Sequence, residues 1–394
     1  MAGAHRDGRA VLADLLAPLG TDRFLAEYYE RQPLVACAKD PERFAGLLSV
    51  DAIDAFLASA DVREGMVQLS NHHAPVDAGT YIDETGRIRT AIVAREYARG
   101  ATIVINQLHE SDYALGQLTR AMEEVFSAQA TTNIYLTPPA NQGFPPHYDN
   151  HDVLVLQVSG AKKWRLWETP VETPYRGERF EQSGFRAETI SREFTLGPGD
   201  VAYIPRGVMH DAENVGEAPS LHITVGLFTK KWADLMLEAV SELALTEPSF
   251  RRSLPPRFAA PDYDRDLARA SFDALVDLVA EKAGMDGAFD LLTDAFIRAR
   301  RPDVRGLVSR PAPLPDARYR RRAFVPWNAA EDEEGRIVLI GPGGDIAFAP
   351  EDGDALERAL SGEIFTLADL VAEDPEAMLR LLWSHGYLER VEEA

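Results

Sequence analysis

The stretch Gly143-Phe144-Pro145-Pro146-His147-Tyr148-Asp149 is followed by the apolar run Val153-Leu154-Val155-Leu156-Gln157-Val158, and together they decide the fold of this chain. The run is short, rich in β-branched residues and preceded by turn-forming residues, which is typical of a buried strand. Side chains two residues apart on an extended segment point to the same side. We therefore expect His147 and Asp149 to point toward one place from a single rigid element.

A later segment supplies a third residue of the same chemical kind. Gly197–Asp200 predicts a turn, Val201–Ile204 a short strand, and Pro205–Gly207 a second turn that leads to His210. Two imidazoles and one carboxylate are the set that holds Fe(II) in non-haem oxygenases and leaves other metal positions open. The sequence therefore predicts that His147, Asp149 and His210 bind a metal and form a catalytic centre.

Two choices stay open on the residues alone. His151 shares the face of His147 and Asp149 if the alternation continues, so it is the rival ligand, although we expect it to line the pocket or to pack. Lys162 and Lys163 are adjacent, and their own positions favour neither as the inward cation.

Five segments around these residues form a pattern that is specific as a set: Asn133–Pro139, Gln142–Phe144, the His147/Asp149 pair, Gly160–Arg165, and Tyr203–Gly207 with His210. The pattern resembles the ribosomal oxygenases, which are JmjC-type cupin enzymes dependent on Fe(II) and 2-oxoglutarate. The likeness is ungapped over about residues 131–168 and 196–225, and weaker likeness extends to both ends. The resemblance implies a double-stranded β-helix core, the cupin or JmjC jelly roll.

The resemblance also implies roles for matching positions. His147, Asp149 and His210 match the metal ligands. Lys162 matches the basic residue that pairs with the far carboxylate of 2-oxoglutarate, a contact that suits a cation in a confined pocket. Asn133 and Tyr135 match residues lining the cosubstrate pocket, and their alternation puts them on one strand face.

A strand predicted from Ser220 to Val225 places Ser220, His222 and Thr224 on one face near the metal, and we assign Thr224 to cosubstrate binding. His222 fits a polar pocket wall and a core histidine equally. Gly226 stands where the family often carries serine, which leaves one cosubstrate or substrate contact open.

The function that the resemblance implies is hydroxylation of a side chain, His or Arg, in a ribosomal protein or another peptide. One alternative keeps the chemistry but acts on a natural-product peptide, a free amino acid or a methylated lysine, which would be demethylated. The other alternative is a cupin scaffold that binds metal or ligand without turnover. Pocket walls and loops such as Thr169–Phe185 would set the specificity, which one sequence does not reveal.

Composition favours an intracellular enzyme. The chain has 394 residues, 45% of them hydrophobic, and a single cysteine, which excludes an internal disulfide framework. The first residues lack the apolar segment of a secretion signal, so we expect a cytoplasmic protein without a membrane span. The net charge of −22 disfavours direct binding to nucleic acid and suits a basic protein partner.

The expected class is α+β, with five regions along the chain. Residues 1–130 form an N-terminal α/β part that includes a helix capped by Ser111, and residues 131–228 form the catalytic core. Residues 229–310 are helical, and in the family this region tends to form a homodimer; an internal bundle is the alternative. Residues 311–330, with Pro311-Ala312-Pro313-Leu314-Pro315, are expected as a linker.

Residues 331–394 combine a hairpin around Gly341–Gly344 with helices at Thr366–Ala372 and Pro375–His385, and this order resembles the winged-helix module that closes the ribosomal oxygenases. Many acidic residues argue against DNA reading there, so we expect a structural or protein-binding role. The arginines at 318 and 320–322 fit a salt-bridged segment better than a nucleic-acid contact.

Overall fold

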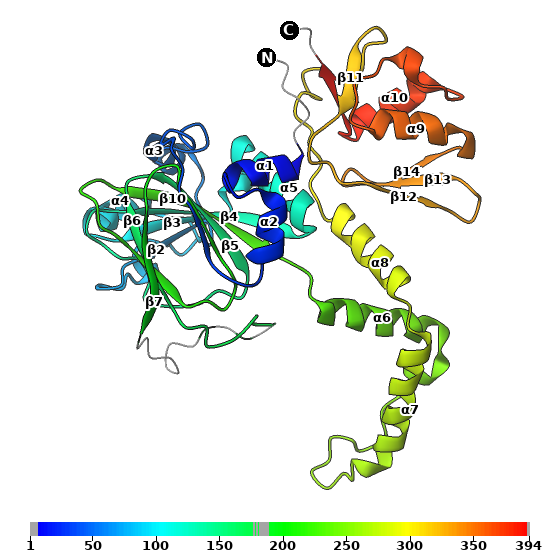
Figure 1. Ribbon diagram of the computed structural model, residues 1–394, viewed down its shortest axis with the longest axis horizontal. Coiled ribbons are helices and arrows are strands. Elements are labelled where there is room, and N and C mark those ends of the chain that lie inside the picture. Colours follow the sequence, from blue (N-terminus) through cyan, green and yellow to red (C-terminus); the bar gives the residue numbers. More distant parts are fainter. Residues whose placement is uncertain (1–6, 176–177, 179, 181–188, 392–394) are drawn as a thin grey trace. The chain divides into compact units, whose positions relative to one another are not determined.

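The computed structural model describes residues 7–175, 178, 180 and 189–391, and these divide into two compact units, residues 7–229 and residues 230–391. Each unit contains both helices and antiparallel strands (Figure 1), which confirms the predicted α+β class. No helix in the described ranges is long and apolar enough to span a membrane.

A seven-stranded antiparallel sheet forms the centre of the first unit, in the order β1-β8-β5-β10-β4-β3-β2. Its strands are β1 (Leu34–Ala36), β2 (Val67–Ser70), β3 (Thr102–Asn106), β4 (Gln129–Thr137), β5 (Asp152–Ser159), β8 (Val201–Ile204) and β10 (Ser220–Phe228). β10 pairs with β4 on one side and with β5 on the other, so its apolar residues from Leu221 to Leu227 are buried. The predicted division at residues 130/131 crosses this sheet, because β1, β2 and β3 belong to the N-terminal part.

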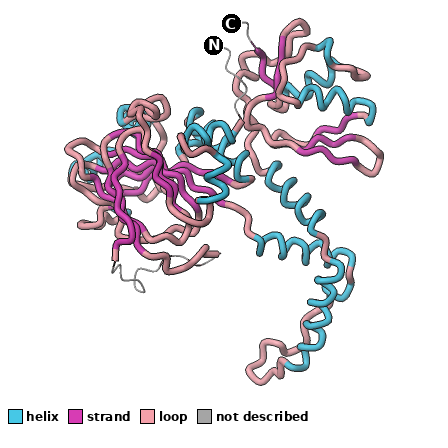
Figure 2. Tube along the Cα trace, in the orientation of Figure 1, coloured by secondary structure: helices cyan, strands magenta, loops and turns pink. Residues whose placement is uncertain are grey.

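A second, three-stranded sheet has the order β7-β6-β9, with β6 (Lys162–Trp167), β7 (Ile190–Leu196) and β9 (His210–Asn214). Figure 2 shows the strands of the first unit gathered together, with helices beside them. Trp164 of β6 shares one apolar cluster with Val155 of β5 and Ile204 of β8. The two sheets therefore pack on a common core, as the cupin-like expectation requires.

In the described part of the first unit, five α-helices accompany the sheets: α1 (Gly8–Leu15), α2 (Thr21–Glu27), α3 (Val50–Ser59), α4 (Thr90–Ala98) and α5 (Tyr113–Phe126). α5 buries Leu115, Leu118 and Met122, which are spaced for one helical face. Its N-cap is Asp112 and not the predicted Ser111, because the Asp112 carboxylate accepts a 2.9 Å hydrogen bond from the Leu115 N–H.

A buried ionic network holds the turn between β8 and β9. The Arg206 guanidinium donates a 2.9 Å hydrogen bond to Asp152, which also accepts one of 2.7 Å from the Tyr203 hydroxyl. Arg206 pairs with Glu30 as well. Because this turn leads directly to His210, the network restrains the backbone that carries the predicted third ligand.

The second unit begins with three helices, α6 (Trp232–Thr246), α7 (Asp266–Lys282) and α8 (Met285–Arg298). α6 and α8 pack through a small cluster that includes Leu235, Ala239 and Ala288. α7 buries none of its residues, and Leu267 and Phe272 on it are 74% and 66% exposed. The helical prediction is correct, but the apolar face of α7 is at most half-buried within this unit.

The C-terminal part of this unit contains β11 (Arg318–Arg321), β12 (Asn328–Glu331), β13 (Ile337–Ile340), β14 (Ile346–Phe348), α9 (Gly353–Leu360), α10 (Pro375–Ser384) and β15 (Leu388–Val391). β13 and β14 form the predicted hairpin. The range 311–330, expected as a linker, is ordered in its second half, because β11 pairs with β15 and Arg320 forms an ion pair with Glu389.

Two helix predictions for this part need correction. The helix expected over Thr366–Ala372 is reduced to a single 3-10 turn at Leu367–Asp369, and α9 was not predicted. Acidic residues dominate the sequence before and within α9, yet Leu356 and Leu360 are buried on one face of it. The charged residues on the exposed face of α9 made its amphipathic pattern difficult to recognise in the sequence.

Candidate functional site

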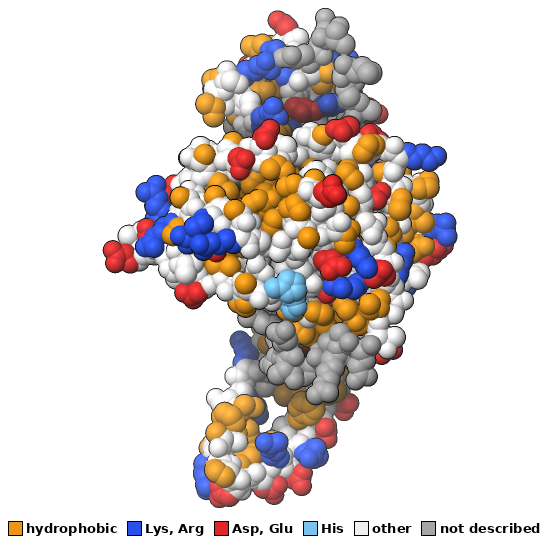
Figure 3. All heavy atoms as spheres, turned by 90° about the vertical axis from the view of Figure 1, so that its left-hand side faces the viewer, with side chains coloured by type: hydrophobic (Ala, Val, Ile, Leu, Met, Phe, Trp, Pro, Cys, Tyr) orange, Lys and Arg blue, Asp and Glu red, His pale blue; other side chains and the backbone are white. Residues whose placement is uncertain are grey.

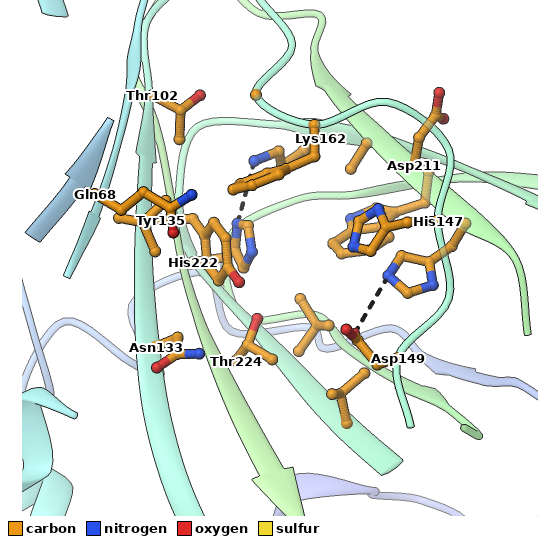
Figure 4. A pocket seen from close by; sticks show the side chains of 18 of the residues that line it. Gln68, Thr102, Asn133, Tyr135, His147, Asp149, Lys162, Asp211, His222 and Thr224 are labelled. Carbon is orange, nitrogen blue, oxygen red and sulfur yellow. Dashed lines mark hydrogen bonds and ion pairs between the residues drawn. The ribbon is translucent and has the colours of Figure 1, made fainter. Parts of the chain in front are cut away.

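His147, Asp149 and His210 lie together in the structure, with ligand atoms all within 4.8 Å of one another. Nε2 of His210 is 3.7 Å from Oδ2 of Asp149, a pair that Figure 4 joins by a dashed line. The two imidazole rings have their centroids 4.6 Å apart. Within the described ranges, no other group of three His, Cys, Asp or Glu side chains has this spacing.

The local backbone differs from the prediction. His147 and Asp149 lie in the loop before β5 and not on a regular strand, because Pro145 and Pro146 lack the N–H groups that a ladder needs. The loop is instead fixed by an isolated bridge. The His147 N–H donates to the His210 carbonyl at 3.0 Å, and the His210 N–H donates back at 2.8 Å. This bridge sets two of the three side chains opposite each other.

The orientation of both imidazoles comes from backbone carbonyls. Nδ1 of His147 lies 2.9 Å from the Pro145 carbonyl, and Nδ1 of His210 lies 2.9 Å from the Val208 carbonyl. A carbonyl only accepts, so each Nδ1 carries the proton and each Nε2 keeps its lone pair. That tautomer is the one in which both Nε2 atoms can bind a metal.

The charges of the group also suit a cation. Burial, followed by the neighbouring His147, lowers the pKa of His210 to about 4, so this imidazole is neutral at pH 7. Burial alone would raise the pKa of Asp149, but the nearby His210 and His147 lower it overall. The group therefore offers a neutral His210 imidazole and an ionised carboxylate.

His151, the rival ligand, is not part of the group. Its ring stacks on Phe228 with centroids 4.4 Å apart and an interplanar angle of 18°. Nδ1 of His151 lies 3.5 Å from the Asn150 side-chain oxygen, which is too long for a strong hydrogen bond. The histidine therefore packs at the edge of the site, as expected.

Lys162 and Lys163, which the residues alone could not separate, face opposite ways. Lys162 is 3% exposed, and its Nζ donates a 2.9 Å hydrogen bond to the Thr137 hydroxyl. Lys163 pairs with Glu193 at 2.9 Å. Burial lowers the pKa of Lys162 to about 7, since no ion pair with a carboxylate offsets the lost hydration in the described part of the chain.

A cavity of about 290 Å³ connects Lys162 with the His-Asp-His group (Figure 4). β4 and β10 form one wall, on which Asn133 lies opposite Thr224 and Tyr135 lies opposite His222. The rings of Tyr135 and His222 stack with centroids 4.7 Å apart and an angle of only 4°. His222 is thus a cavity wall, and burial followed by the charge of Lys162 keeps its pKa well below its usual value.

Ser220 does not line the cavity, although it shares the strand face. Its hydroxyl accepts a 2.9 Å hydrogen bond from the Gln157 amide, so its position is structural. The cavity also contains side chains that the sequence prediction missed, from β2, β3, β6 and β9: Gln68, Thr102, Asn106, Trp164 and Asp211. Thr102 and Asn106 lie on one face of β3, whose apolar residues Ile103-Val104-Ile105 were the available sequence signal.

A side-chain network supports the loop that carries His147. Asp211 accepts hydrogen bonds of 2.8 and 2.9 Å from the Arg165 guanidinium, and one of 2.9 Å from the Gln142 amide. The same amide nitrogen of Gln142 donates to the Phe144 carbonyl at 2.8 Å. Phe144 lines the cavity, so this network holds one of its walls in place.

Comparison with known proteins places this site in a family. The JmjC domain matches residues 105–235. The chain is 31% identical over 315 residues to the bifunctional lysine-specific demethylase and histidyl-hydroxylase NO66 of Aedes aegypti, covering 73% of this chain and 48% of that protein. It is 30% identical over 323 residues to ribosomal oxygenase 1 of Gallus gallus, covering 77% and 53%. The chain thus spans about half the length of these curated relatives.

The fold is shared with solved ribosomal oxygenases. YcfD of Escherichia coli, in complex with cobalt and 2-oxoglutarate, matches with a TM-score of 0.54 and 17% identity over 94% of this chain and 98% of that one. The same protein with cobalt and succinic acid gives a TM-score of 0.52. This likeness concerns the fold alone, whereas the family assignment rests on the domain match and the relatives. The chain therefore belongs to the ribosomal oxygenase branch of the JmjC-type cupin proteins.

Proposed function

We propose that this protein is an Fe(II)- and 2-oxoglutarate-dependent dioxygenase that hydroxylates a side chain of a protein or peptide. One observation supports the proposal most strongly. A single cavity contains both the His147, Asp149 and His210 group and the buried side chain of Lys162. A buried lysine without a carboxylate partner needs an anion, and a dicarboxylate supplies it while its other end reaches the metal.

The donor set fits Fe(II), because two Nε2 atoms and one carboxylate form the facial set that leaves positions open for a chelating cosubstrate and oxygen. When bound, the iron would supply the oxidising chemistry that converts 2-oxoglutarate to succinate and hydroxylates the substrate. The residues of this chain would hold and orient the reactants. His147, Asp149 and His210 would bind the metal, with the tautomers set by the Pro145 and Val208 carbonyls.

The cavity wall would position the cosubstrate and exclude water. Lys162 and the Thr137 hydroxyl would bind the far carboxylate, and the stacked Tyr135 and His222 rings would cover the carbon chain. Asn133 and Thr224 would complete the wall. The roles of Lys162, Asn133 and Tyr135 follow from the family pattern, and the contacts in the structure add Thr137 and His222.

For the substrate we propose a histidine or arginine side chain of a ribosomal protein. The named relatives are ribosomal oxygenases and histidyl-hydroxylases, and the net charge of −22 suits a basic partner. Figure 3 shows one face of the first unit, where hydrophobic side chains gather near the middle with acidic and basic groups around them. A methylated lysine is the second candidate, because the Aedes aegypti relative is also named a lysine-specific demethylase.

We further propose a homodimer formed through the helices α6 to α8. The exposed apolar residues of this region would need a partner of the same kind, and Trp232, Leu245 and Leu267 are each at least 74% exposed. The C-terminal hairpin and helices would then form a winged-helix-like module with a structural or protein-binding role. A reducing cytoplasm is the proposed compartment, since it suits the single cysteine and ferrous iron.

Anaerobic titration of the metal-free protein with Fe(II) and 2-oxoglutarate tests the proposal. A visible charge-transfer band should develop only when both are present, and His210→Ala should abolish it while remaining folded. A screen of basic peptides with a central His, Arg or methyl-lysine, read by mass spectrometry, would then separate hydroxylation from demethylation. A folded wild-type protein without the band would favour a non-catalytic cupin scaffold.

A further inference from the structure

The cavity-facing row of β10 continues one position beyond the side chains already described. His222 and Thr224 both line the cavity, and alternation puts residue 226 on the same face, one step further along the strand. Residue 226 lies beside Val153 of β5, which also lines the cavity. Position 226 therefore extends the wall, but it is a glycine and contributes no side chain.

The imidazole of His151 fills the space that a side chain at 226 would take. A Cβ added to Gly226 would lie 2.9 Å from Cδ2 and 3.0 Å from Nε2 of His151, closer than carbon atoms normally approach. The ring is also stacked on Phe228 with centroids 4.4 Å apart, and the same Cβ would lie 3.4 Å from Cε2 of Phe228. Gly226 and Phe228 thus form a seat that holds the ring in one orientation.

This seat gives His151 a definite place at the site. The residue follows Asp149 by two positions, and it stays half-buried. Within the described ranges its ring nitrogens have only a weak partner, since Nδ1 lies 3.5 Å from the Asn150 side-chain oxygen. A held, half-exposed imidazole beside the metal group can donate or accept one hydrogen bond to a molecule that reaches the cavity.

We propose that His151, seated over Gly226, is a specificity-determining residue that hydrogen-bonds the peptide chain next to the target side chain. The proposal rests on the proposed function and narrows it, because a contact at this place selects a polypeptide over a free amino acid. The His151 imidazole occupies the space in which a side chain at position 226 would lie. Gly226 is required because any Cβ there displaces the ring.

Substitutions on both sides of the seat test the proposal. His151→Ala should raise the KM for the best peptide of the screen about five- to tenfold, the size of one hydrogen bond, with kcat changed less than twofold. Gly226→Ala should produce a similar rise, because its methyl displaces the ring. In the double variant the two effects should not add, since either change already empties the seat. His385→Ala, a half-buried histidine of the other unit, is the matched control and should leave KM unchanged.

A second readout does not depend on turnover. With Zn(II) in place of iron and 2-oxoglutarate present, the ¹³C-labelled His151 ring signals, identified by their absence in His151→Ala, should shift when the peptide is added. A peptide that is hydroxylated while KM and these signals stay unchanged would overturn the contact and leave the proposed function standing. If the charge-transfer band forms but no peptide binds, both the proposed polypeptide substrate and the proposed hydrogen bond from His151 to it are wrong.

Discussion

β10 and α7 are both rich in apolar residues, yet the structure treats them in opposite ways. β10 is paired on both sides and buries almost all its side chains, whereas α7 buries none. An apolar pattern specifies that a surface needs cover, but it does not say which surface provides it. The covered strand forms a wall of the candidate cavity, because a fixed backbone is needed to hold cavity side chains in place.

The largest effect should come from the metal-binding candidates in the loop before β5, which the bridge between His147 and His210 holds in place. His147→Ala or Asp149→Ala should lower 2-oxoglutarate turnover by more than about 100-fold, the upper range for removing a group that merely supports a ligand. The far-ultraviolet circular dichroism should be unchanged, since both residues lie in a loop and not in the core. Succinate formation measures the loss, and retained turnover in either variant would disprove the proposed metal set.

Lys162→Ala should come next, with about a 10- to 100-fold rise in the dissociation constant for 2-oxoglutarate, the range for losing a charged hydrogen bond. Lys163→Ala is the matched control, because Lys163 pairs with Glu193 instead of facing the cavity. Calorimetric titration of the metal-loaded protein compares the two. Equal affinities for Lys162→Ala and the wild type would mean that another cation binds the carboxylate.

The same lysine predicts a smaller, graded effect of pH. Burial lowers the pKa of Lys162 to about 7, and a bound carboxylate would raise it again. Affinity for 2-oxoglutarate should therefore be full below pH 7 and fall as pH rises through it, by at most about tenfold per pH unit. Lys162→Arg remains charged at these pH values and should flatten the profile. A flat wild-type profile would show that the lysine is charged before binding.

The smallest effect on chemistry should come from the uncovered helix. Leu267→Asp with Phe272→Asp should dissociate the proposed dimer, because two charges would enter an apolar interface. Turnover should change by less than about twofold, since the candidate site lies within the other unit. Analytical ultracentrifugation reports the mass, and Arg269→Ala on the same helix is the control. A wild-type monomer would leave the helices in need of another partner.

The strand after residue 152 and the catalytic candidates were accessible from the sequence, because turn residues and an apolar run mark them locally. The cupin-like core was expected only from the resemblance to the ribosomal oxygenases. The backbone conformation at His147 could not be predicted, because two prolines interrupt the expected strand. An isolated bridge to His210 fixes this loop instead. The ordered strand β11 was missed for a similar reason. Its partner β15 lies near residue 390, so the pairing joins segments too far apart in the sequence for a local pattern to reveal it.

The sequence by itself determined which chemical groups are available: two histidines, one aspartate, adjacent lysines and a glycine at 226. Only the tertiary structure decided their use. It turned Lys162 inward and paired Lys163 at the surface, added Gln68 and Asn106 to the cavity, and seated His151 over Gly226. Residue type and spacing are local properties, whereas burial and facing depend on strands that are distant along the chain.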